Sequence, residues 1–122
     1  MKILLVDDDE IFRTLLSEVL EEAGFEISAH ENGLLAWEAL QAEGADIVVS
    51  DVNMPEMGGY ELLKLIREDA RFANIPVVMM ALKSDVPAGA EGGADEYLLK
   101  PFPNEDLVAL VQTLEQRILG GN

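Results

Sequence analysis

The chain has 122 residues, of which 49% are hydrophobic and 26% charged, and these values are typical of one globular domain. It has no cysteine and a single histidine, which excludes disulfide bonds, thiolate metal sites and a zinc site built on histidines. The formal net charge of −16 repels nucleic acids, and neither a membrane span nor a signal peptide is recognisable, so we expect a cytoplasmic protein without direct nucleic-acid or membrane contacts.

Short apolar runs alternate with segments of helical periodicity in the first half of the chain. In order, we expect a strand at residues 2–6, a helix at 11–24, a strand at 25–30, a helix at 34–44 and a strand at 46–51. The last of these, DIVVSD, is apolar on both faces, as in a central strand of a parallel sheet. It nevertheless ends on a carboxylate, Asp51, and burying that group requires compensation.

The second half continues the alternation but lacks one clear helix. In order, we expect a helix at 60–69, a strand at 75–82, a strand at 96–100 and a closing helix at 104–119 with Asn104 as its N-cap. A fourth helix belongs at residues 84–95, but Pro87 and three glycines leave that segment little helix propensity. We expect a loop there with at most a turn or two of helix.

Alternation of this kind implies right-handed crossovers and a parallel sheet covered by helices on both faces. We therefore expect an α/β fold of the flavodoxin-like (βα)5 type, a three-layer sandwich with five strands in the order 2-1-3-4-5 and a short or degraded fourth helix. Residues 1–119 form the predicted domain, and the sequence GGN at 120–122 has the composition of a flexible tail or the start of a linker.

Acidic residues follow the predicted strands at one edge of this sheet. Asp7, Asp8 and Asp9 follow the first strand, Asp51 ends the third, and Lys100 ends the fifth. Two carboxylates about 5 Å apart repel each other by roughly 3 kcal/mol at an effective dielectric constant near 20, so a hard cation or a lysine must offset the repulsion. Carboxylate and carbonyl oxygens suit Mg²⁺ or Mn²⁺. An ionised Asp51 beside such a metal and Lys100 can attack phosphorus and form an aspartyl phosphate, whereas Asp9 is better explained as a helix N-cap.

Three stretches, LLVDDDE, SDVNMPEMGG and YLLKPF, follow one another along the chain. Together they resemble the acidic-pair, phosphoacceptor and lysine-proline motifs of response-regulator receiver domains, the phosphoacceptor modules of two-component signal transduction. The resemblance covers residues 1–119. It also implies that Pro101 follows a cis peptide bond.

The resemblance gives each matching residue an expected role. Asp51 would be the phosphoacceptor, Asp8 a direct metal ligand and Asp7 a supporting one. The backbone carbonyl of Asn53 would also bind the Mg²⁺ or Mn²⁺, and Lys100 would pair with the phosphoryl group. The implied partners are a sensor histidine kinase or phosphotransfer protein and a downstream output domain or protein. The domain would assist only its own phosphorylation and dephosphorylation, and so would not be an enzyme.

The sequence departs from the family where the output signal begins. Members usually carry a threonine or serine at the end of the fourth strand, followed by a small residue, but this chain has Ala81 and Leu82. The hydroxyl that would report phosphorylation is absent at Ala81. Tyr97, which corresponds to the aromatic residue that couples to that hydroxyl in the family, is present.

Two other classes of function compete with a phosphoacceptor. Ala81 and the weak fourth helix would permit an atypical receiver that binds proteins independently of phosphorylation. A dehalogenase-type phosphatase needs a second aspartate where Asn53 stands, and a flavodoxin needs a phosphate-binding loop where DDDE would repel the ligand. The sequence therefore argues against both enzymes.

Overall fold

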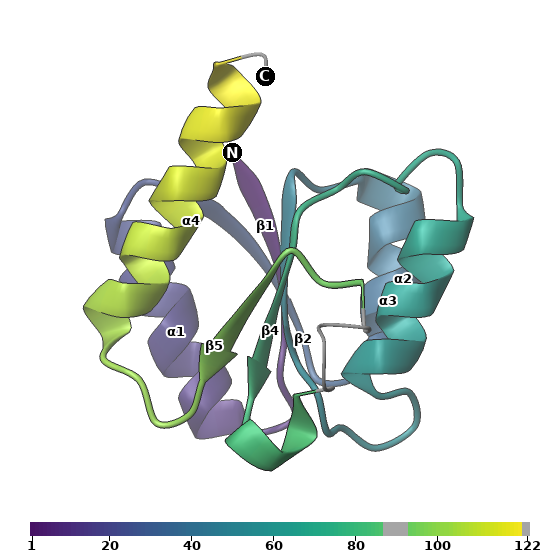
Figure 1. Ribbon diagram of the computed structural model, residues 1–122, viewed down its shortest axis with the longest axis horizontal. Coiled ribbons are helices and arrows are strands. Elements are labelled where there is room, and N and C mark those ends of the chain that lie inside the picture. The colour runs from purple at the N-terminus through teal and green to yellow at the C-terminus, as the bar shows by residue number, and fades with distance from the viewer. Residues whose placement is uncertain (87–92, 121–122) are drawn as a thin grey trace.

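The computed structural model describes residues 1–86 and 93–120. Its elements are β1 (Lys2–Val6), α1 (Glu10–Glu22), β2 (Glu26–His30), α2 (Gly33–Glu43), β3 (Ile47–Asp51), α3 (Gly59–Glu68), β4 (Val77–Ala81), the short 3-10 turn η1 (Lys83–Asp85), β5 (Glu96–Leu99) and α4 (Asn104–Leu119) (Figure 1). Each strand and helix lies within about two residues of its predicted position, a common difference between methods of assigning element ends.

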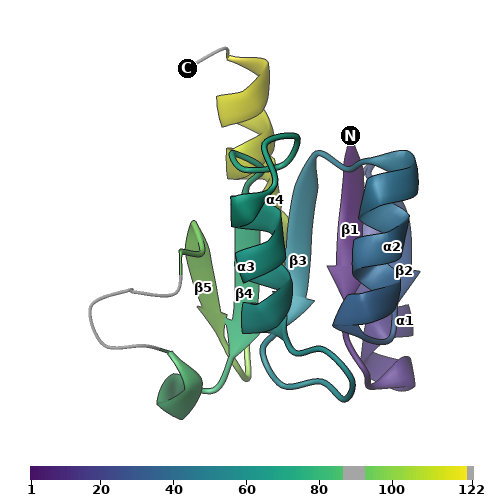
Figure 2. The same cartoon turned by 90° about the vertical axis from the view of Figure 1, so that its right-hand side faces the viewer.

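The strands form one parallel sheet in the order β2-β1-β3-β4-β5, as the sequence predicts. Helices α1 and α4 cover one face of the sheet, and α2 and α3 cover the other (Figures 1 and 2). The result is the three-layer, flavodoxin-like sandwich. Because all strands run in the same direction, their carboxyl ends lie at one edge of the sheet, where ligands bind in folds of this type.

Two apolar clusters lie on the two faces of the sheet, and β1 contributes to both. Its side chains alternate, so Ile3 and Leu5 join the cluster under α1 and α4, whereas Leu4 and Val6 join the cluster under α2 and α3. All four are at most 1% exposed. Complete burial of a side chain of this size stabilises the fold by about 1.5 to 3 kcal/mol, which explains why the central strands are apolar on both faces.

The predicted N-cap of the closing helix is wrong. Pro103 occupies the N-cap position of α4 with φ −68° and ψ 144°, and Asn104 is already the first helical residue. Proline fixes φ near this value and has no N–H, so the helix begins directly after it without a side-chain cap. Glu105 and Asp106 in the first turn interact favourably with the helix dipole instead.

The segment predicted as a loop in place of a fourth helix is described only in part. After β4 the chain forms the three-residue turn η1, while residues 87–92 lie outside the described part of the chain. The predicted tail at 120–122 begins with Gly120, the C-cap of α4, and its last two residues also lie outside the described ranges.

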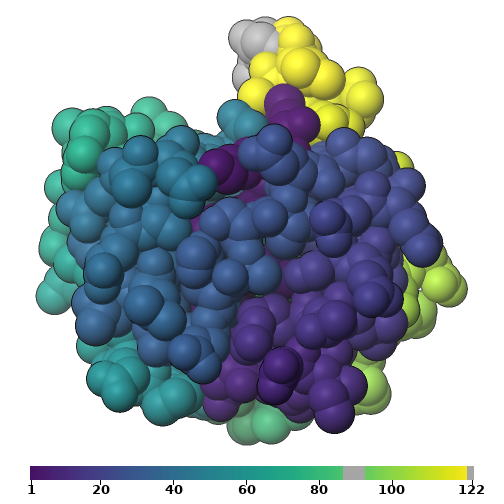
Figure 3. Space-filling view, turned by 180° about the vertical axis from the view of Figure 1, so that it is seen from behind, coloured from purple at the N-terminus to yellow at the C-terminus, as the bar shows by residue number. Residues whose placement is uncertain are grey.

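The last turns of α4 extend beyond the rest of the molecule (Figures 1 and 3). Leu119, at the end of this helix, is 67% exposed. Among the helices that the structure describes, none combines the length and the apolar character that a membrane span requires.

Candidate functional site

Acidic side chains from two neighbouring strands meet at the carboxyl edge of the sheet. Strands β1 and β3 pair with Val6 opposite Ser50, so the next residue of each strand, Asp7 and Asp51, comes to the same place. Oxygen atoms of Asp7, Asp8 and Asp51 lie within 4.8 Å of one another. The structure thus brings together the three carboxylates that the sequence singles out.

Asp7 lies at the buried end of this cluster and is only 1% exposed. Its Oδ1 accepts a hydrogen bond from the backbone N–H of Asp9 at 2.9 Å, whereas its Oδ2 has no partner among the described residues. Burial raises the pKa of Asp7 to about 6, and the negative charges of Asp51 and Asp8 add to this rise. The Asp9 N–H and the Lys100 ammonium oppose it. This Oδ2 atom is thus a buried electron-pair donor without a hydrogen-bond partner among the described residues.

Asp51 ends β3 and is 9% exposed. Its Oδ1 accepts a hydrogen bond from the Val52 N–H at 2.8 Å and lies 3.1 Å from the Lys100 ammonium nitrogen. Lys100 follows β5, where its N–H donates to the Ala81 carbonyl at 2.9 Å, and its ammonium lies 5.4 Å from the centre of the Phe12 ring. Strand pairing and ring contact therefore hold the lysine over the carboxylate.

Two predictions for the residues beside these groups, the helix cap at Asp9 and the cis bond before Pro101, are confirmed. Asp8 is exposed. Asp9 is the N-cap of α1, because its side chain accepts a hydrogen bond from the Phe12 N–H at 3.1 Å. The peptide bond between Lys100 and Pro101 is cis, as the resemblance implies.

The loop from β3 to α3 brings the start of a helix against the backbone of Asp51. The N–H of Gly59 donates to the Val52 carbonyl at 2.8 Å. A methyl group at Gly59 would overlap the carbonyl oxygen of Asp51, so only glycine allows this approach. The helix start therefore fixes the position of the strand end that carries the carboxylate.

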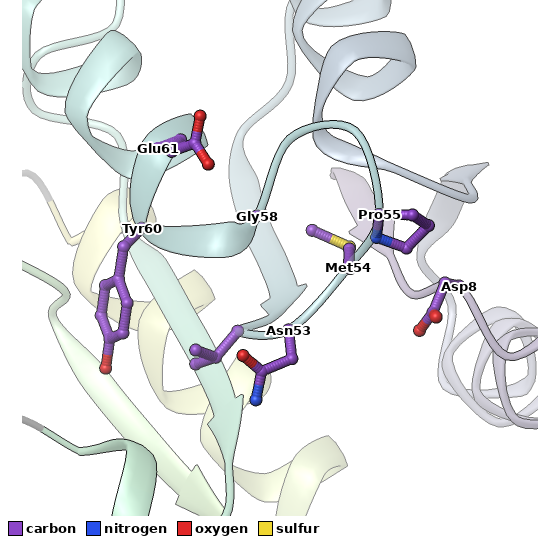
Figure 4. Close-up of a pocket in the computed structure, with 8 residues that line it drawn as sticks. Asp8, Asn53, Met54, Pro55, Gly58, Tyr60 and Glu61 are labelled. Carbon is purple, nitrogen blue, oxygen red and sulfur yellow. The ribbon is translucent and has the colours of Figure 1, made fainter.

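A cavity of about 640 Å³ opens over the carboxylates. Four aspartates, one lysine and four apolar residues line it: Asp7, Asp8, Asp9, Phe12, Asp51, Leu82, Lys100, Pro101 and Phe102. A second hollow of about 470 Å³ shares Asp8 with the first and extends along the β3–α3 loop to Tyr60 and Glu61 (Figure 4). Both hollows thus open to solvent next to the carboxylates.

The residues expected to carry the output signal lie at the end of β4 and in the neighbouring strand β5. Ala81 is buried at the end of β4, and the side chain of Leu82 is 52% exposed at the cavity rim. Tyr97 pairs with Met79 in the sheet, and its hydroxyl is buried without a hydrogen bond of standard geometry to any described residue. Burial raises the pKa of the nearby Tyr60, and Tyr97 adds to that rise. The Tyr97 hydroxyl therefore points toward the interior of the protein.

Sequence reasoning missed two residues next to the site, Tyr60 and Asp85. The Tyr60 hydroxyl donates a hydrogen bond to the Asp85 carbonyl at 2.7 Å, and the Asp85 carboxylate accepts one from the side-chain amide of Asn53 at 3.0 Å. Asp85 comes four positions after the end of β4, in a segment with no periodicity, so its only sequence signal was a charge near a strand end.

Comparison with known proteins points to one family. Residues 3–112 match the family model of the response regulator receiver domain. The chain is 37% identical over 107 residues to the chemotaxis protein CheY1 of Helicobacter pylori, covering 84% of this chain and 86% of that protein. It is 37% identical over 121 residues to the response regulator Rre1 of Synechocystis sp., covering 96% of this chain. It spans only 52% of Rre1, about half its length.

Solved structures agree with the sequence matches. The chemotaxis response regulator CheY4 of Vibrio cholerae superposes with a TM-score of 0.85 at 33% identity, covering 93% of this chain and 97% of that one. The receiver domain of the Francisella response regulator 1452 superposes with a TM-score of 0.87 at 29% identity, covering 96% and 98%. Sheet order, family model and relatives together show that this chain belongs to the response regulator receiver domains of two-component signalling.

Proposed function

We propose that this domain accepts a phosphoryl group on Asp51 from a sensor histidine kinase or phosphotransfer protein, with Mg²⁺ or Mn²⁺ bound beside it, and passes the signal to an output domain or protein. The observation that carries the proposal is the meeting of three carboxylates, Asp7, Asp8 and Asp51, with Lys100 against the last of them. Family membership supports it, because receiver domains are signalling modules rather than enzymes with separate substrates.

The donor set fits a hard divalent cation. The Oδ2 atom of Asp7 is buried without a hydrogen-bond partner among the described residues, in a cluster that repels itself unless positive charge enters. Oxygen donors without sulfur or imidazole suit Mg²⁺ or Mn²⁺ better than zinc. We assign Asp8 and Asp51 as direct ligands, Asp7 as a supporting residue and the Asn53 backbone carbonyl as a further ligand.

The side chain of Asp51 is prepared for attack on phosphorus. Both described donors, the Val52 N–H and the Lys100 ammonium, contact Oδ1, so Oδ2 is left to form the new bond. The Oδ2–P bond forms as the bond between phosphorus and the donor's imidazole nitrogen breaks, and the electron pair of that bond leaves with the imidazole. Lys100 neutralises charge on the phosphoryl oxygens. Charge neutralisation at the carboxylates and the phosphoryl group is the chemistry that Mg²⁺ supplies when bound.

Intact mass spectrometry tests the proposal. Incubation with Mg²⁺ and a small-molecule phosphodonor should add the mass of one phosphoryl group to the wild-type chain and none to Asp51→Asn. The free energy of unfolding of Asp51→Asn should equal or exceed that of the wild type, because the amide is nearly isosteric with the carboxylate and relieves carboxylate repulsion. Phosphoryl uptake by Asp51→Asn would show that the nucleophile is another residue, and its absence from both proteins would contradict the proposal.

One feature favours a second candidate, a receiver that binds its partner independently of phosphorylation. Ala81 carries no hydroxyl, and the hydroxyl of Tyr97 is buried. If this alternative holds, Asp51→Asn should bind the partner with the same affinity as the phosphorylated wild type. A phosphorylation-dependent affinity would exclude it.

A further inference from the structure

A side-chain contact joins the two loops that follow the central strands β3 and β4. The amide nitrogen Nδ2 of Asn53 donates a hydrogen bond to the carboxylate oxygen Oδ2 of Asp85 at 3.0 Å. Asn53 lies two residues after Asp51, and Asp85 ends the turn η1. Phosphoryl transfer as proposed above makes no use of this contact.

Asp85 is held firmly enough to position another residue. Its backbone carbonyl accepts a hydrogen bond from the Tyr60 hydroxyl at 2.7 Å, and its N–H donates to the Leu82 carbonyl at 2.9 Å. Tyr60 lies in the first turn of α3 and packs against the apolar cluster on that face of the sheet. The carboxylate of Asp85 is therefore tied to a packed helix through one side chain and to β4 through its own turn.

Asn53, in contrast, has little else to hold it. It is exposed, and the bond to Asp85 is the only hydrogen bond that it makes within residues 1–86 and 93–120. Figure 4 shows its side chain extending to the same side of the loop as the Tyr60 ring. Without this bond, the Asn53 backbone would keep only the constraint of its covalent neighbours, and a loop residue of this kind samples several conformations.

We propose that Asp85 is a positioning residue for the divalent-cation site: its carboxylate holds the Asn53 amide and thereby fixes the backbone carbonyl of Asn53. The inference rests on the proposed function, in which that carbonyl is a ligand. Loss of a partner that is hydrogen-bonded to a ligand residue usually changes metal affinity by about 10- to 100-fold. Because Asn53 is exposed, we expect the lower end of that range.

Mg²⁺ titrations followed by backbone amide NMR signals near Asp8 and Asp51 test the proposal. Asp85→Ala and Asn53→Ala should each weaken Mg²⁺ binding by about tenfold, and the double variant should bind no more weakly than either single variant. Asp85→Asn keeps an acceptor oxygen and should bind Mg²⁺ nearly as the wild type does. Asp69→Ala removes a carboxylate at the far end of α3 and serves as the control, with unchanged affinity.

The variants separate positioning from simple attraction between Asp85 and the cation. If Asp85→Asn loses as much affinity as Asp85→Ala, the charge of Asp85 is what matters, and the proposal is wrong. It is equally wrong if Asp85→Ala binds Mg²⁺ like the wild type. Circular dichroism should first show that each variant keeps the wild-type fold.

A measurement without metal keeps this inference distinct from the proposed function. In Mg²⁺-free protein, Asp85→Ala should shift the amide signals of Asn53 and Met54 and speed their hydrogen exchange, and Asp85→Asn should restore both. If the wild type binds no Mg²⁺, the proposed function fails, and these signals still report whether Asp85 holds Asn53. Unchanged signals in Asp85→Ala would overturn the positioning role.

Discussion

Asp7 is the most deeply buried carboxylate among the described residues. A buried carboxylate is stable in its charged form only if hydrogen bonds or positive charge replace the water that it loses. Asp7 has one N–H donor, from Asp9, and shares the Lys100 charge with Asp51. This incomplete compensation is why its pKa rises to about 6. Metal-free protein at neutral pH therefore carries an unfavourable charge at the base of its own site.

Replacing that charge should stabilise the metal-free protein. The folded-state pKa of Asp7 is about 6 and its ordinary value is 3.8, so the folded state holds the proton more tightly. This tighter proton binding contributes stability that is fully present below about pH 4 and is lost as the pH rises through about 6. Asp7→Asn should therefore raise the free energy of unfolding at pH 7 by about 2 to 3 kcal/mol in chelator.

Urea unfolding at pH 4.5 and pH 7 measures this effect. The wild type should lose stability between the two values, and Asp7→Asn should lose less. Asp9→Asn is the matched control, because asparagine also caps helices and Asp9 is exposed. An Asp7→Asn variant with the wild-type pH dependence would contradict the assigned pKa.

At the scale of elements, strands β4 and β5 carry the unusual part of this receiver. They pair with Ala81 opposite Leu99 and Met79 opposite Tyr97. In the family to which the chain belongs, a hydroxyl at the end of β4 moves toward the phosphoryl group and the aromatic residue of β5 follows. Here the strand end carries a methyl group and the aromatic hydroxyl is buried. We therefore expect β5 to move little on phosphorylation.

We predict a small response of β5 to a phosphoryl mimic. With Mg²⁺ and beryllofluoride, amide signals near Asp51 should shift strongly and those around Tyr97 weakly. Ala81→Ser restores a hydroxyl, and a hydrogen bond to a charged group is worth about 1.5 to 3 kcal/mol, or about ten- to a hundredfold in the ratio of two states. The Tyr97 signals should therefore shift more in Ala81→Ser than in the wild type.

The same experiment reports on association. No lysine or arginine lies between Lys83 and Lys100. This segment, which ends with β5, therefore lacks the basic half of a salt-bridged dimer contact. Hydrodynamic size should stay that of a monomer with beryllofluoride. Large shifts at Tyr97 in the wild type, or dimer formation, would show that the prediction is wrong.

The elements also show how far sequence reasoning reaches. Strand and helix positions and the sheet order followed from apolar periodicity and alternation, and Asp7, Asp8, Asp51 and Lys100 met because parallel strands end at one edge. Asn104 was misplaced as a cap because the fixed φ of Pro103 outweighed cap preference. The bond from Asn53 to Asp85 joins two loops, and the path of a loop is set by contacts that no periodic pattern encodes.

For the whole molecule, the excess of acidic residues is the dominant property. The chain has twenty-four aspartates and glutamates but only eight lysines and arginines, so the charges of the folded chain repel one another. Salt shortens the range of this repulsion from about 10 Å at 0.1 M to about 3 Å at 1 M. The free energy of unfolding should therefore depend on ionic strength through charges over the whole surface. It should depend on divalent cations through the proposed cation site.

Thermal unfolding separates the two contributions. Sodium chloride should raise the melting temperature of the wild type and of Asp51→Asn by similar amounts, because both carry nearly the same surface charge. Millimolar Mg²⁺ should stabilise the wild type beyond sodium chloride of equal ionic strength, since bound ligand favours the folded state. That excess should shrink in Asp51→Asn. An equal Mg²⁺ effect in both proteins would place the divalent-cation site elsewhere.

The contact between Gly59 and the backbone of Asp51 also limits how this sequence can evolve. Every missense change in a glycine codon introduces a side chain, and any side chain at Gly59 would meet the Asp51 carbonyl oxygen. Gly59 takes no part in chemistry, yet no neighbouring codon offers a neutral substitute. A lineage that keeps α3 against the acceptor strand therefore inherits this glycine unchanged, whatever happens to the partners and loops around it.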